Sequence, residues 1–330
     1  MTGPVAGAGS RDGSGAPRAA SGAIRLDGIL VVDKPAGPTS HDIVGLVRRL
    51  SGMKRVGHGG TLDPFARGVL PIFLGRATRV VEYHLGDRKQ YRATVCFGAS
   101  STTDDLEGEL TPVPRAPSGA VLARADVEAA LAAFRGPIVQ VPPAYSAIKV
   151  AGRRAYALAR AGQQPELSPR SVEIDRIELL EWDDSDPQRP IAVIEVDCSA
   201  GTYIRAIARD LGAALGTGAY LGALSRTASG PFRLADAIAL ETVRAAVEAG
   251  PAALARLLLP IDAGLSLPSI QLTDDELKAV VRGQFIRPSA ESSGPASELP
   301  VRLLAPGGEL AGFGRWDGTR VMPDKVLVDA

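Results

Sequence analysis

The stretch GHGGTLDPFARG, residues 57–68, places His58 and Asp63 among glycines, with Pro64 directly after the acid. It lacks the Gly-Lys-Ser/Thr ending of a phosphate-binding loop, and the chain has no GxGxxG motif. What remains is a single carboxylate displayed on a Gly-rich turn, with Leu62 and Pro64 beside it to fix its direction. Taken alone, an Asp before Pro is more often a turn former than a catalytic group.

Metal and covalent chemistry find little support elsewhere in the chain. There are three histidines in unrelated settings and two cysteines, Cys96 and Cys198, far apart in the sequence. Neither set has the spacing of a zinc or iron site or of a disulfide framework. No Ser or Cys nucleophile motif is present either. We therefore expect no metal and no cofactor.

Three other segments contain residues that could take part in binding or chemistry. Lys34 ends an apolar run in VDKPAG, Tyr91 stands among cations and amides in RKQYR, and SAGTYIR contains Tyr203 and Arg205. An aromatic face beside cations suits an unstacked base, and a helix N-terminus suits an anion. The ordinary alternatives are a solvated lysine, a strand-filling tyrosine and a helix cap, and each segment taken alone leaves them open.

The helices and strands that would position these residues can be predicted from the spacing of apolar residues along the chain. Ile43, Val44, Val47 and Leu50 have helical spacing, whereas residues 90–98 alternate as a strand does. Ser40 and Thr202 are the expected N-caps of two helices. The predicted elements are strands at 28–33, 69–75, 90–98, 171–182, 189–199 and 219–232, helices at 40–52, 76–86, 124–136 and 202–216, and a loop from Thr102 to Ser118.

The whole chain bounds the function classes. It has 330 residues, formal net charge zero and no apolar run as long as a membrane span. A neutral total argues weakly against a nucleic-acid partner. However, basic residues dominate from Arg48 to Arg92, and acids gather at 102–109 and 181–186, so one face can still be basic. Residues 1–23 have no secretory signal pattern and are expected to form a disordered tail, which favours a cytoplasmic protein.

In order along the chain, the segments GILVVDKPAGPTSHD, RVGHGGTLDPFARGVLPI, KQYRATVCFG, AYSAIKVAGRRAYALAR, CSAGTYIRAIARDLG and LSRTASGPF are those that matter most. Together they resemble the TruB family of tRNA pseudouridine-55 synthases from about Gly28 to Phe232. The family isomerises the T-loop uridine of tRNA without a cofactor. The resemblance implies a catalytic role for Asp63, Tyr91 and Arg205. Arg205 would hold Asp63 ionised, because a nearby opposite charge lowers a carboxylate pKa.

The same resemblance implies the substrate-binding residues. Tyr203 would lie in the substrate pocket, Leu224 would pack against the base, and His58 would fill the space that flipped nucleotides leave. Lys34 belongs to the family's Lys-Pro motif and is included with them, although a structural role suits it better. The implied binding set is His58, Tyr203, Leu224 and Lys34.

The implied fold is α+β, with a mixed, mainly antiparallel sheet flanked by helices and a small C-terminal β-rich PUA-like domain. We expect a catalytic domain at 24–264, with an RNA-clamping segment at 144–162, and an RNA-binding domain at 265–330. The expected partner is the T-stem loop of tRNA, with no membrane, no obligatory protein partner and a monomeric state. Two alternatives stay open: an RNA-folding protein whose catalysis is secondary, and the guide-RNA-dependent relative that works with partner proteins.

Overall fold

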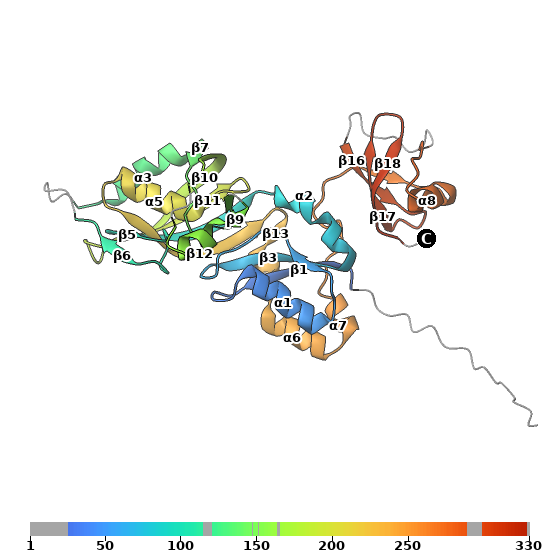
Figure 1. Cartoon of the computed structure of the whole chain (residues 1–330), viewed down its shortest axis with the longest axis horizontal. Coiled ribbons are helices and arrows are strands. Elements are labelled where there is room, and N and C mark those ends of the chain that lie inside the picture. Colours follow the sequence, from blue (N-terminus) through green and yellow to red (C-terminus); the bar gives the residue numbers. More distant parts are fainter. Residues whose placement is uncertain are drawn as a thin grey trace, which may run out of the picture.

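The computed structural model describes residues 26–114, 121–146, 148–150, 152–163, 166–288 and 299–328. A large sheet runs through the main body, and a small sheet forms a separate module at the C-terminal end (Figure 1). The predicted tail at residues 1–23 lies outside the described residues.

The large sheet has ten strands in the order β14-β1-β3-β12-β4-β11-β10-β7, with β13 paired to β12 and β2 to β3. Only the β1–β14 and β12–β3 pairs are parallel among these strands. The expected mixed, mainly antiparallel sheet is therefore confirmed. Its strands are β1 (Gly28–Lys34), β2 (Val56–His58), β3 (Arg67–Leu74), β4 (Lys89–Phe97), β7 (Gly136–Gln140), β10 (Arg170–Asp183), β11 (Ile191–Cys198), β12 (Ala219–Ser229), β13 (Phe232–Arg233) and β14 (Ile238–Ala239).

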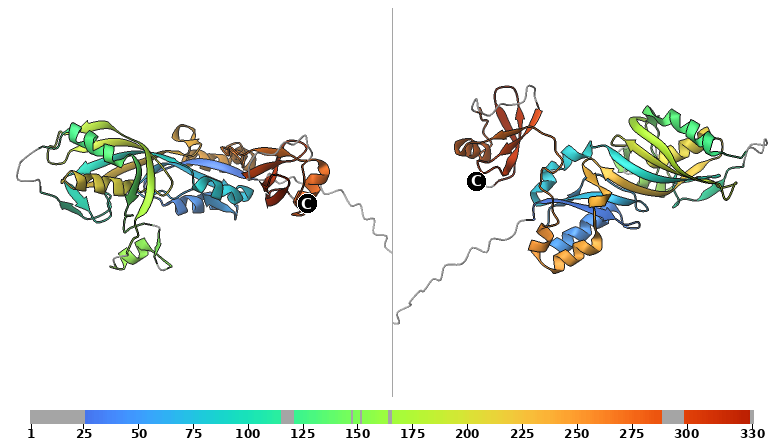
Figure 2. Two further views of the ribbon diagram at one scale, coloured as in Figure 1. Left: turned by 90° about the horizontal axis from the view of Figure 1, so that it is seen from above. Right: turned by 180° about the vertical axis from the view of Figure 1, so that it is seen from behind.

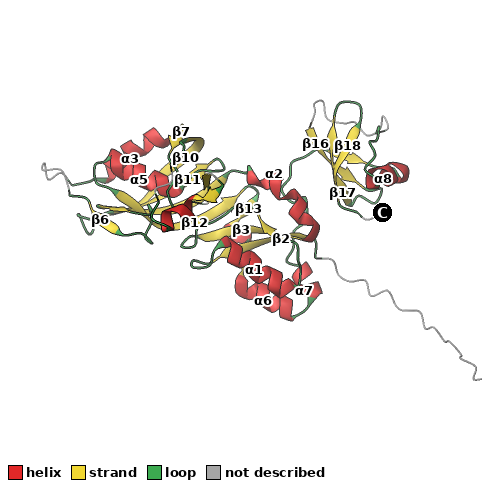
Figure 3. Ribbon diagram, in the orientation of Figure 1, coloured by secondary structure: helices red, strands yellow, loops and turns green. Residues whose placement is uncertain are grey.

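Strand β1 carries a continuous apolar run, residues 29–32, because both of its faces are covered there. Leu30 and Val32 face helices α1 (Ser40–Ser51), α6 (Leu240–Glu248) and α7 (Pro251–Ala255), and they share one apolar cluster with them. Ile29 and Val31 point the other way, into a cluster that includes Phe313 of the C-terminal module. Figure 3 shows the three helices gathered on one side of the sheet. Alternate residues of one strand thus belong to two cores.

The other half of the sheet is covered by α3 (Arg124–Leu131) and α5 (Ile204–Ala214), which pack on β4, β10, β11 and β12. Four further helical segments are short: η1 (Gly75–Val80), α2 (Val81–Leu85), η2 (Ala132–Phe134) and η3 (Leu234–Asp236). None of the helices formed by the described residues is both long enough and apolar enough to span a membrane.

Both predicted N-caps were wrong, although both helices are present. Thr39 caps α1, because its hydroxyl accepts from the Asp42 amide at 3.0 Å while the Asp42 carboxylate accepts from the Thr39 amide at 2.9 Å. Helix α5 follows Tyr203, and the Thr202 hydroxyl donates to the Ser199 carbonyl at 2.9 Å instead of capping. The reciprocal Thr39–Asp42 arrangement leaves Ser40 free for another task.

The predicted loop from Thr102 to Ser118 was only partly right. Strands β5 (Ala99–Ser101) and β6 (Leu110–Pro112) pair as a hairpin, and residues 115–120 lie outside the described part. The tip reverses at Asp104, whose φ is +62°. The sequence pattern did not reveal this hairpin, because its tip is polar and contains glycine and its strands are too short to show an alternation of apolar and polar residues.

The C-terminal module consists of β15 (Ser269–Gln271), α8 (Asp274–Val281), β16 (Leu299–Leu304), β17 (Leu310–Trp316) and β18 (Val321–Val326). It contacts the main body beside α2 (Figure 2), where Lys325 Nζ lies 2.5 Å from Glu82 Oε1 and 3.2 Å from the Tyr83 hydroxyl. Phe313 and Leu327 complete the apolar side of this contact.

The segment predicted to clamp RNA, residues 144–162, contains a hairpin of two strands, each two residues long, and one helix. These are β8 (Lys149–Val150), β9 (Arg153–Arg154) and α4 (Ala155–Arg160). Figure 2 shows the segment projecting away from the large sheet. Ala147 and Ala151 lie outside the described residues. The predicted turn and basic helix are therefore present where the structure describes the segment.

Candidate active site

The loop between β2 and β3 displays Asp63, and a buried hydroxyl fixes the residue before it. Ser40 Oγ accepts from the Leu62 amide at 2.8 Å and donates to the Leu62 carbonyl at 3.0 Å. Ser40 and Leu62 are both buried. Because both polar backbone groups of Leu62 are satisfied by one side chain, the direction of the next residue, Asp63, is set from α1.

Lys34 holds the other side of the same loop. Its Nζ donates to the carbonyls of Pro64 at 3.1 Å, Ala66 at 2.6 Å and Pro35 at 2.9 Å, and the side chain is fully buried. An ammonium has three donors, so none is left for RNA. The inclusion of Lys34 among the substrate-binding residues is thereby corrected: it supports the loop. Burial lowers the pKa of Lys34 to about 8, although the Asp63 carboxylate opposes this.

Arg226 on β12 is a third support, and it was not singled out from the sequence. Its Nε donates to the Val69 carbonyl at 2.8 Å, Nη1 to Thr61 at 3.3 Å and Nη2 to Gly60 at 3.2 Å. The side chain is 1% exposed. A lone arginine in LSRTASGPF gives no local signal, because only the pairing of β12 with β3 brings it behind the loop.

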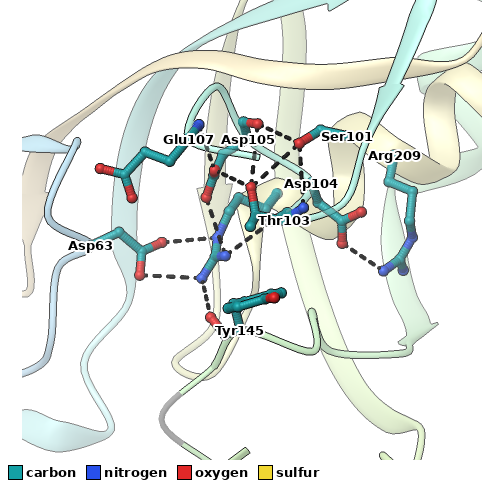
Figure 4. Close-up of polar contacts among 9 residues, drawn as sticks. Asp63, Ser101, Thr103, Asp104, Asp105, Glu107, Tyr145 and Arg209 are labelled. Carbon is teal, nitrogen blue, oxygen red and sulfur yellow. Dashed lines mark hydrogen bonds and ion pairs between the residues drawn. The ribbon is translucent and has the colours of Figure 1, made fainter. Parts of the chain in front are cut away.

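Asp63 faces Arg205 of α5 across the site; in Figure 4 dashed lines join the labelled Asp63 to this guanidinium, which is the one unlabelled side chain. Arg205 Nε lies 3.0 Å from Asp63 Oδ2, and Nη2 donates to Oδ1 at 3.2 Å. The arginine side chain is 4% exposed and the aspartate side chain 33%. A guanidinium that meets both oxygens fixes the plane of the carboxylate as well as its charge.

Arg205 is itself held from three further directions. Nη1 donates to the Thr103 carbonyl at 3.1 Å and lies 3.2 Å from Asp105 Oδ2, while Nη2 donates to the Tyr145 carbonyl at 3.0 Å. Asp105 is buried and also accepts from the Glu107 amide at 3.0 Å. Sequence reasoning missed Asp105, since one acid in the polar run TTDDLEGE carries no mark of burial.

The ionisation of Asp63 depends on burial and on the charges around the carboxylate. Burial raises the pKa of the Asp63 carboxyl above its ordinary value; Arg205 opposes that rise, and the nearby Asp105 adds to it. Arg205 lowers the Asp63 pKa, as expected for a nearby opposite charge, but the loss of water around the carboxylate outweighs the ion pair. Arg205 therefore limits the rise instead of reversing it.

A cavity of about 230 Å³ opens in front of Asp63. Tyr91 comes from β4 and Leu224 from β12, where Leu224 pairs with Ala93, so the two side chains stand on one face of neighbouring strands. Burial raises the pKa of the Tyr91 phenol, which favours the protonated form. Of the predicted residues, the cavity wall brings together Asp63, Tyr91, Tyr203, Arg205 and Leu224.

Tyr203 is fixed by its backbone and its ring. Gln140 accepts from the Tyr203 amide at 3.1 Å and donates to its carbonyl at 3.3 Å. The Arg170 guanidinium lies 5.6 Å from the ring centroid, a cation–π distance. The residue is thus held at the start of α5, on the cavity rim.

His58 ends β2, and the described cavity wall does not include it. Burial lowers the pKa of the imidazole, and the positive charge of Arg226 adds to this effect, so the ring is neutral at physiological pH. Its Nδ1 is buried without a hydrogen-bond partner among the described residues. The described His, Cys, Asp and Glu side chains form no group of three that could hold a metal ion.

Comparison with known proteins gives the same family for most of the chain. Residues 48–204 match the model described as TruB family pseudouridylate synthase (N terminal domain), and residues 205–266 match the tRNA pseudouridylate synthase B C-terminal domain. The tRNA pseudouridine synthase B of Synechococcus sp. (strain WH7803) is 45% identical over 305 residues, covering 92% of this chain and 98% of the relative. That of Pseudomonas aeruginosa (strain UCBPP-PA14) is 42% identical over 309 residues, covering 92% and 96%.

Solved structures agree on the fold. A Cbf5-Nop10-Gar1 complex contains a chain 26% identical to this one, with a TM-score of 0.67 and coverage of 92% of this chain and 86% of that one. A chain of an H/ACA RNP bound to a substrate RNA containing 2'-deoxyuridine has a TM-score of 0.68 at 24% identity. Its identity to the two tRNA pseudouridine synthase B relatives extends over nearly their whole length. The chain therefore belongs to the TruB family of pseudouridylate synthases.

Proposed function

We propose that this chain converts the T-loop uridine at position 55 of tRNA into pseudouridine, with Asp63 as the catalytic carboxylate. The observation that carries the assignment is the Asp63–Arg205 pair at 3.0 and 3.2 Å on the wall of a cavity that Tyr91 and Leu224 also line. A carboxylate aimed by a guanidinium, beside an aromatic ring and an aliphatic side chain, suits attack next to a stacked base.

The reaction requires little besides these groups. The bond between C1′ and N1 of uracil breaks, the base rotates, and a bond forms between C1′ and C5; the C5 hydrogen leaves as a proton, and N1 gains a proton from water. Product and substrate are isomers, so neither an oxidant nor an energy source is consumed. Asp63 can act at the sugar, at the base or in elimination, and the ion pair would serve each of these routes.

The target uridine must leave its stack to reach the cavity. Unstacking costs a few kcal/mol, and base–aromatic stacking returns about 1–3 kcal/mol. Tyr91 supplies the ring and Leu224 an apolar contact at 6% exposure. His58, neutral and just outside the cavity wall, would contact the space that the flipped nucleotide leaves.

RNA would be held by two further parts of the chain. The first is the projecting segment 144–162, which includes the exposed Arg153. The second is the PUA-like domain at 265–330, in which the guanidinium groups of Arg287 and Arg320 lie 5.9 and 5.6 Å from the ring centroid of the exposed Phe285. An aromatic ring flanked by cations suits an unpaired base with neighbouring phosphates. The catalytic domain then spans 24–264.

We further propose that the chain works alone, as a monomer in the cytoplasm. The relatives that it matches along nearly their full length are each named tRNA pseudouridine synthase B, whereas the 26% identical chain comes from a complex with Nop10 and Gar1. A chain that needed such partners would show no product when purified by itself.

The test is product formation on an unmodified tRNA transcript. Purified wild type should form pseudouridine at position 55, and Asp63→Asn, which keeps the shape of the side chain, should not. Lack of product from wild type would refute the activity, and wild-type rates from Asp63→Asn would refute the role of Asp63. If Asp63→Asn forms no product yet still accelerates tRNA folding, the chain has an additional RNA-folding role that does not depend on catalysis.

A further inference from the structure

Arg209 lies one helical turn after Arg205 on α5 and on the same face of the helix. Its Nη1 contacts Asp104 Oδ2 at 2.9 Å, its Nη2 donates to the Val141 carbonyl at 2.9 Å, and its Nε donates to Asp210 Oδ1 at 2.8 Å. The described residues that line the cavity do not include Arg209. Any effect of Arg209 on the reaction must therefore pass through other residues.

The partner of Arg209, Asp104, has an unusual backbone conformation. It is the one non-glycine among the described residues with a positive φ, +62°. Aspartate tolerates this conformation better than most side chains, but it still carries a steric cost. Three contacts hold the residue there: the ion pair with Arg209, the Leu221 amide that donates to its carbonyl at 3.0 Å, and its own amide, which donates to the Ser101 carbonyl at 3.2 Å.

The reversal at Asp104 turns both of its neighbours toward Arg205 (Figure 4). The Thr103 carbonyl accepts from Arg205 Nη1 at 3.1 Å, and Asp105 Oδ2 lies 3.2 Å from the same nitrogen. The left-handed turn at Asp104 thus lies directly between the two hairpin-tip groups that Arg205 contacts.

Arg209 also reaches the second segment that holds Arg205. Val141, whose carbonyl it binds, begins the short stretch that ends at Tyr145 and Ser146. The Tyr145 carbonyl accepts from Arg205 Nη2 at 3.0 Å, and Ser146 lines the cavity. Apart from Asp63, every group that the structure shows in contact with the Arg205 guanidinium lies on a segment that Arg209 binds.

We propose that Arg209 and Asp104 form a positioning pair for Arg205, fixing the hairpin tip and the 141–146 stretch so that the Arg205 guanidinium meets both oxygens of Asp63. The proposal rests on the roles given above to Asp63 and Arg205. Neither member of the pair lines the cavity in front of Asp63.

The test uses variants that separate the ion pair from the backbone turn. Arg209→Met removes the cation but keeps a long side chain. Asp104→Gly removes the carboxylate and adopts a positive φ without strain, so the fold is retained. Arg176→Met is the matched control, because Arg176 also pairs with two carboxylates, of Glu178 and Glu195, on the exposed face of β10. Melting temperatures of all variants establish that they are folded.

Single-turnover rates and tRNA affinity are measured for each variant and for the double variant. We expect Arg209→Met and Asp104→Gly each to lower the rate by about 10- to 100-fold, the size that a misplaced catalytic group produces. Affinity should stay at the wild-type value, and the double variant should be no slower than the slower single variant, because both changes break one pair. Arg176→Met should match wild type.

The pH profile separates positioning from a loss of folded protein. Arg205, Asp105 and Lys34 are the charged groups that act on Asp63. If Arg205 shifts away, the Asp63 pKa rises further. As the pH is lowered, the variant should then lose activity at a higher pH than wild type does. A smaller folded fraction would lower the rate equally at every pH and would overturn the proposal, as would wild-type rates from Arg209→Met. An inactive wild type would instead refute the proposed function itself.

Discussion

Replacing Arg205 with Met removes the cation that faces Asp63 at 3.0 and 3.2 Å and leaves an apolar side chain in its place. Burial already raises the pKa of the Asp63 carboxyl, and Arg205 is the main group that opposes it. In the variant the buried Asp105 also loses its cation, so that two carboxylates lie close together without the guanidinium that they shared. Both changes favour the protonated, inactive form of Asp63.

The size of the effect follows from the contacts that are lost. A hydrogen bond to a charged group contributes about 1.5–3 kcal/mol, and the two contacts to Asp63 join the same pair of ions, so they count once. Since each 1.4 kcal/mol is about tenfold in rate, we expect kcat at neutral pH to fall by about 10- to 100-fold from this interaction alone. Because Asp63 remains present, raising the pH should restore part of the rate.

The assay follows the hydrogen that leaves C5 of the target uridine, using tRNA labelled with tritium at that position and measured from acid to alkaline pH. Activity needs ionised Asp63 and disappears as the pH falls through its pKa, so the acid limb of the Arg205→Met profile should lie at higher pH than that of wild type. Arg205→Lys keeps the charge but not the two-point contact and should fall between them. If the limb of Arg205→Met coincides with that of wild type, Arg205 does not act on the ionisation of Asp63.

Four other changes test the supports of the site. Ser40→Ala leaves both backbone groups of Leu62 without their partner and should lower the free energy of unfolding by about 1–3 kcal/mol in chemical denaturation; no loss would show that water replaces the hydroxyl. Asp105→Asn removes the charge that raises the Asp63 pKa, so the acid limb of activity should move to lower pH, and a move to higher pH would contradict this. Phe285→Ala should weaken binding of whole tRNA by about 1–3 kcal/mol but not binding of an isolated T-arm stem-loop; an equal loss for both RNAs would exclude the stacking role. For Lys34, burial lowers the pKa to about 8 from 10.5, so between these two pH values the unfolded chain binds one more proton than the folded chain. The free energy of unfolding of wild type relative to Lys34→Met should therefore increase with pH in this range. A decrease would show that the fold favours the ammonium form.

The elements with a clear period could be predicted from the sequence. Strand β1, helix α1 and strand β4 lie where the patterns place them, because each buries an apolar face long enough to show its period. The caps could not be predicted, since Thr39 and Ser40 are both acceptable N-caps and only the Asp42 carboxylate decides between them. The β5–β6 hairpin was not predicted, because strands of three residues are too short to show an alternation of apolar and polar residues.

The site was predictable in part for a similar reason. Asp63, Tyr91 and Arg205 stand in distinctive segments, and the resemblance to a family assigned their roles before the cavity was known. Asp105 and Arg226 could not be found in this way, because their importance comes from burial and from partners distant in the sequence. The direction of the Asp63 pKa shift was also beyond the sequence, since it depends on how much water the fold removes.

The cations around the catalytic loop have different roles: some hold the loop backbone, and one contacts the Asp63 carboxylate. Lys34 and Arg226 bring two buried cations close to the loop, and their donors point to loop and strand carbonyls rather than to the Asp63 oxygens. Lys34 still acts on Asp63 through its charge, which favours the ionised carboxylate. Arg205 occupies one edge of the carboxylate, and the side chain nevertheless stays 33% exposed. Because the cations that fix the loop do not cover the acid, Asp63 keeps an open face toward the cavity, where the flipped base must arrive.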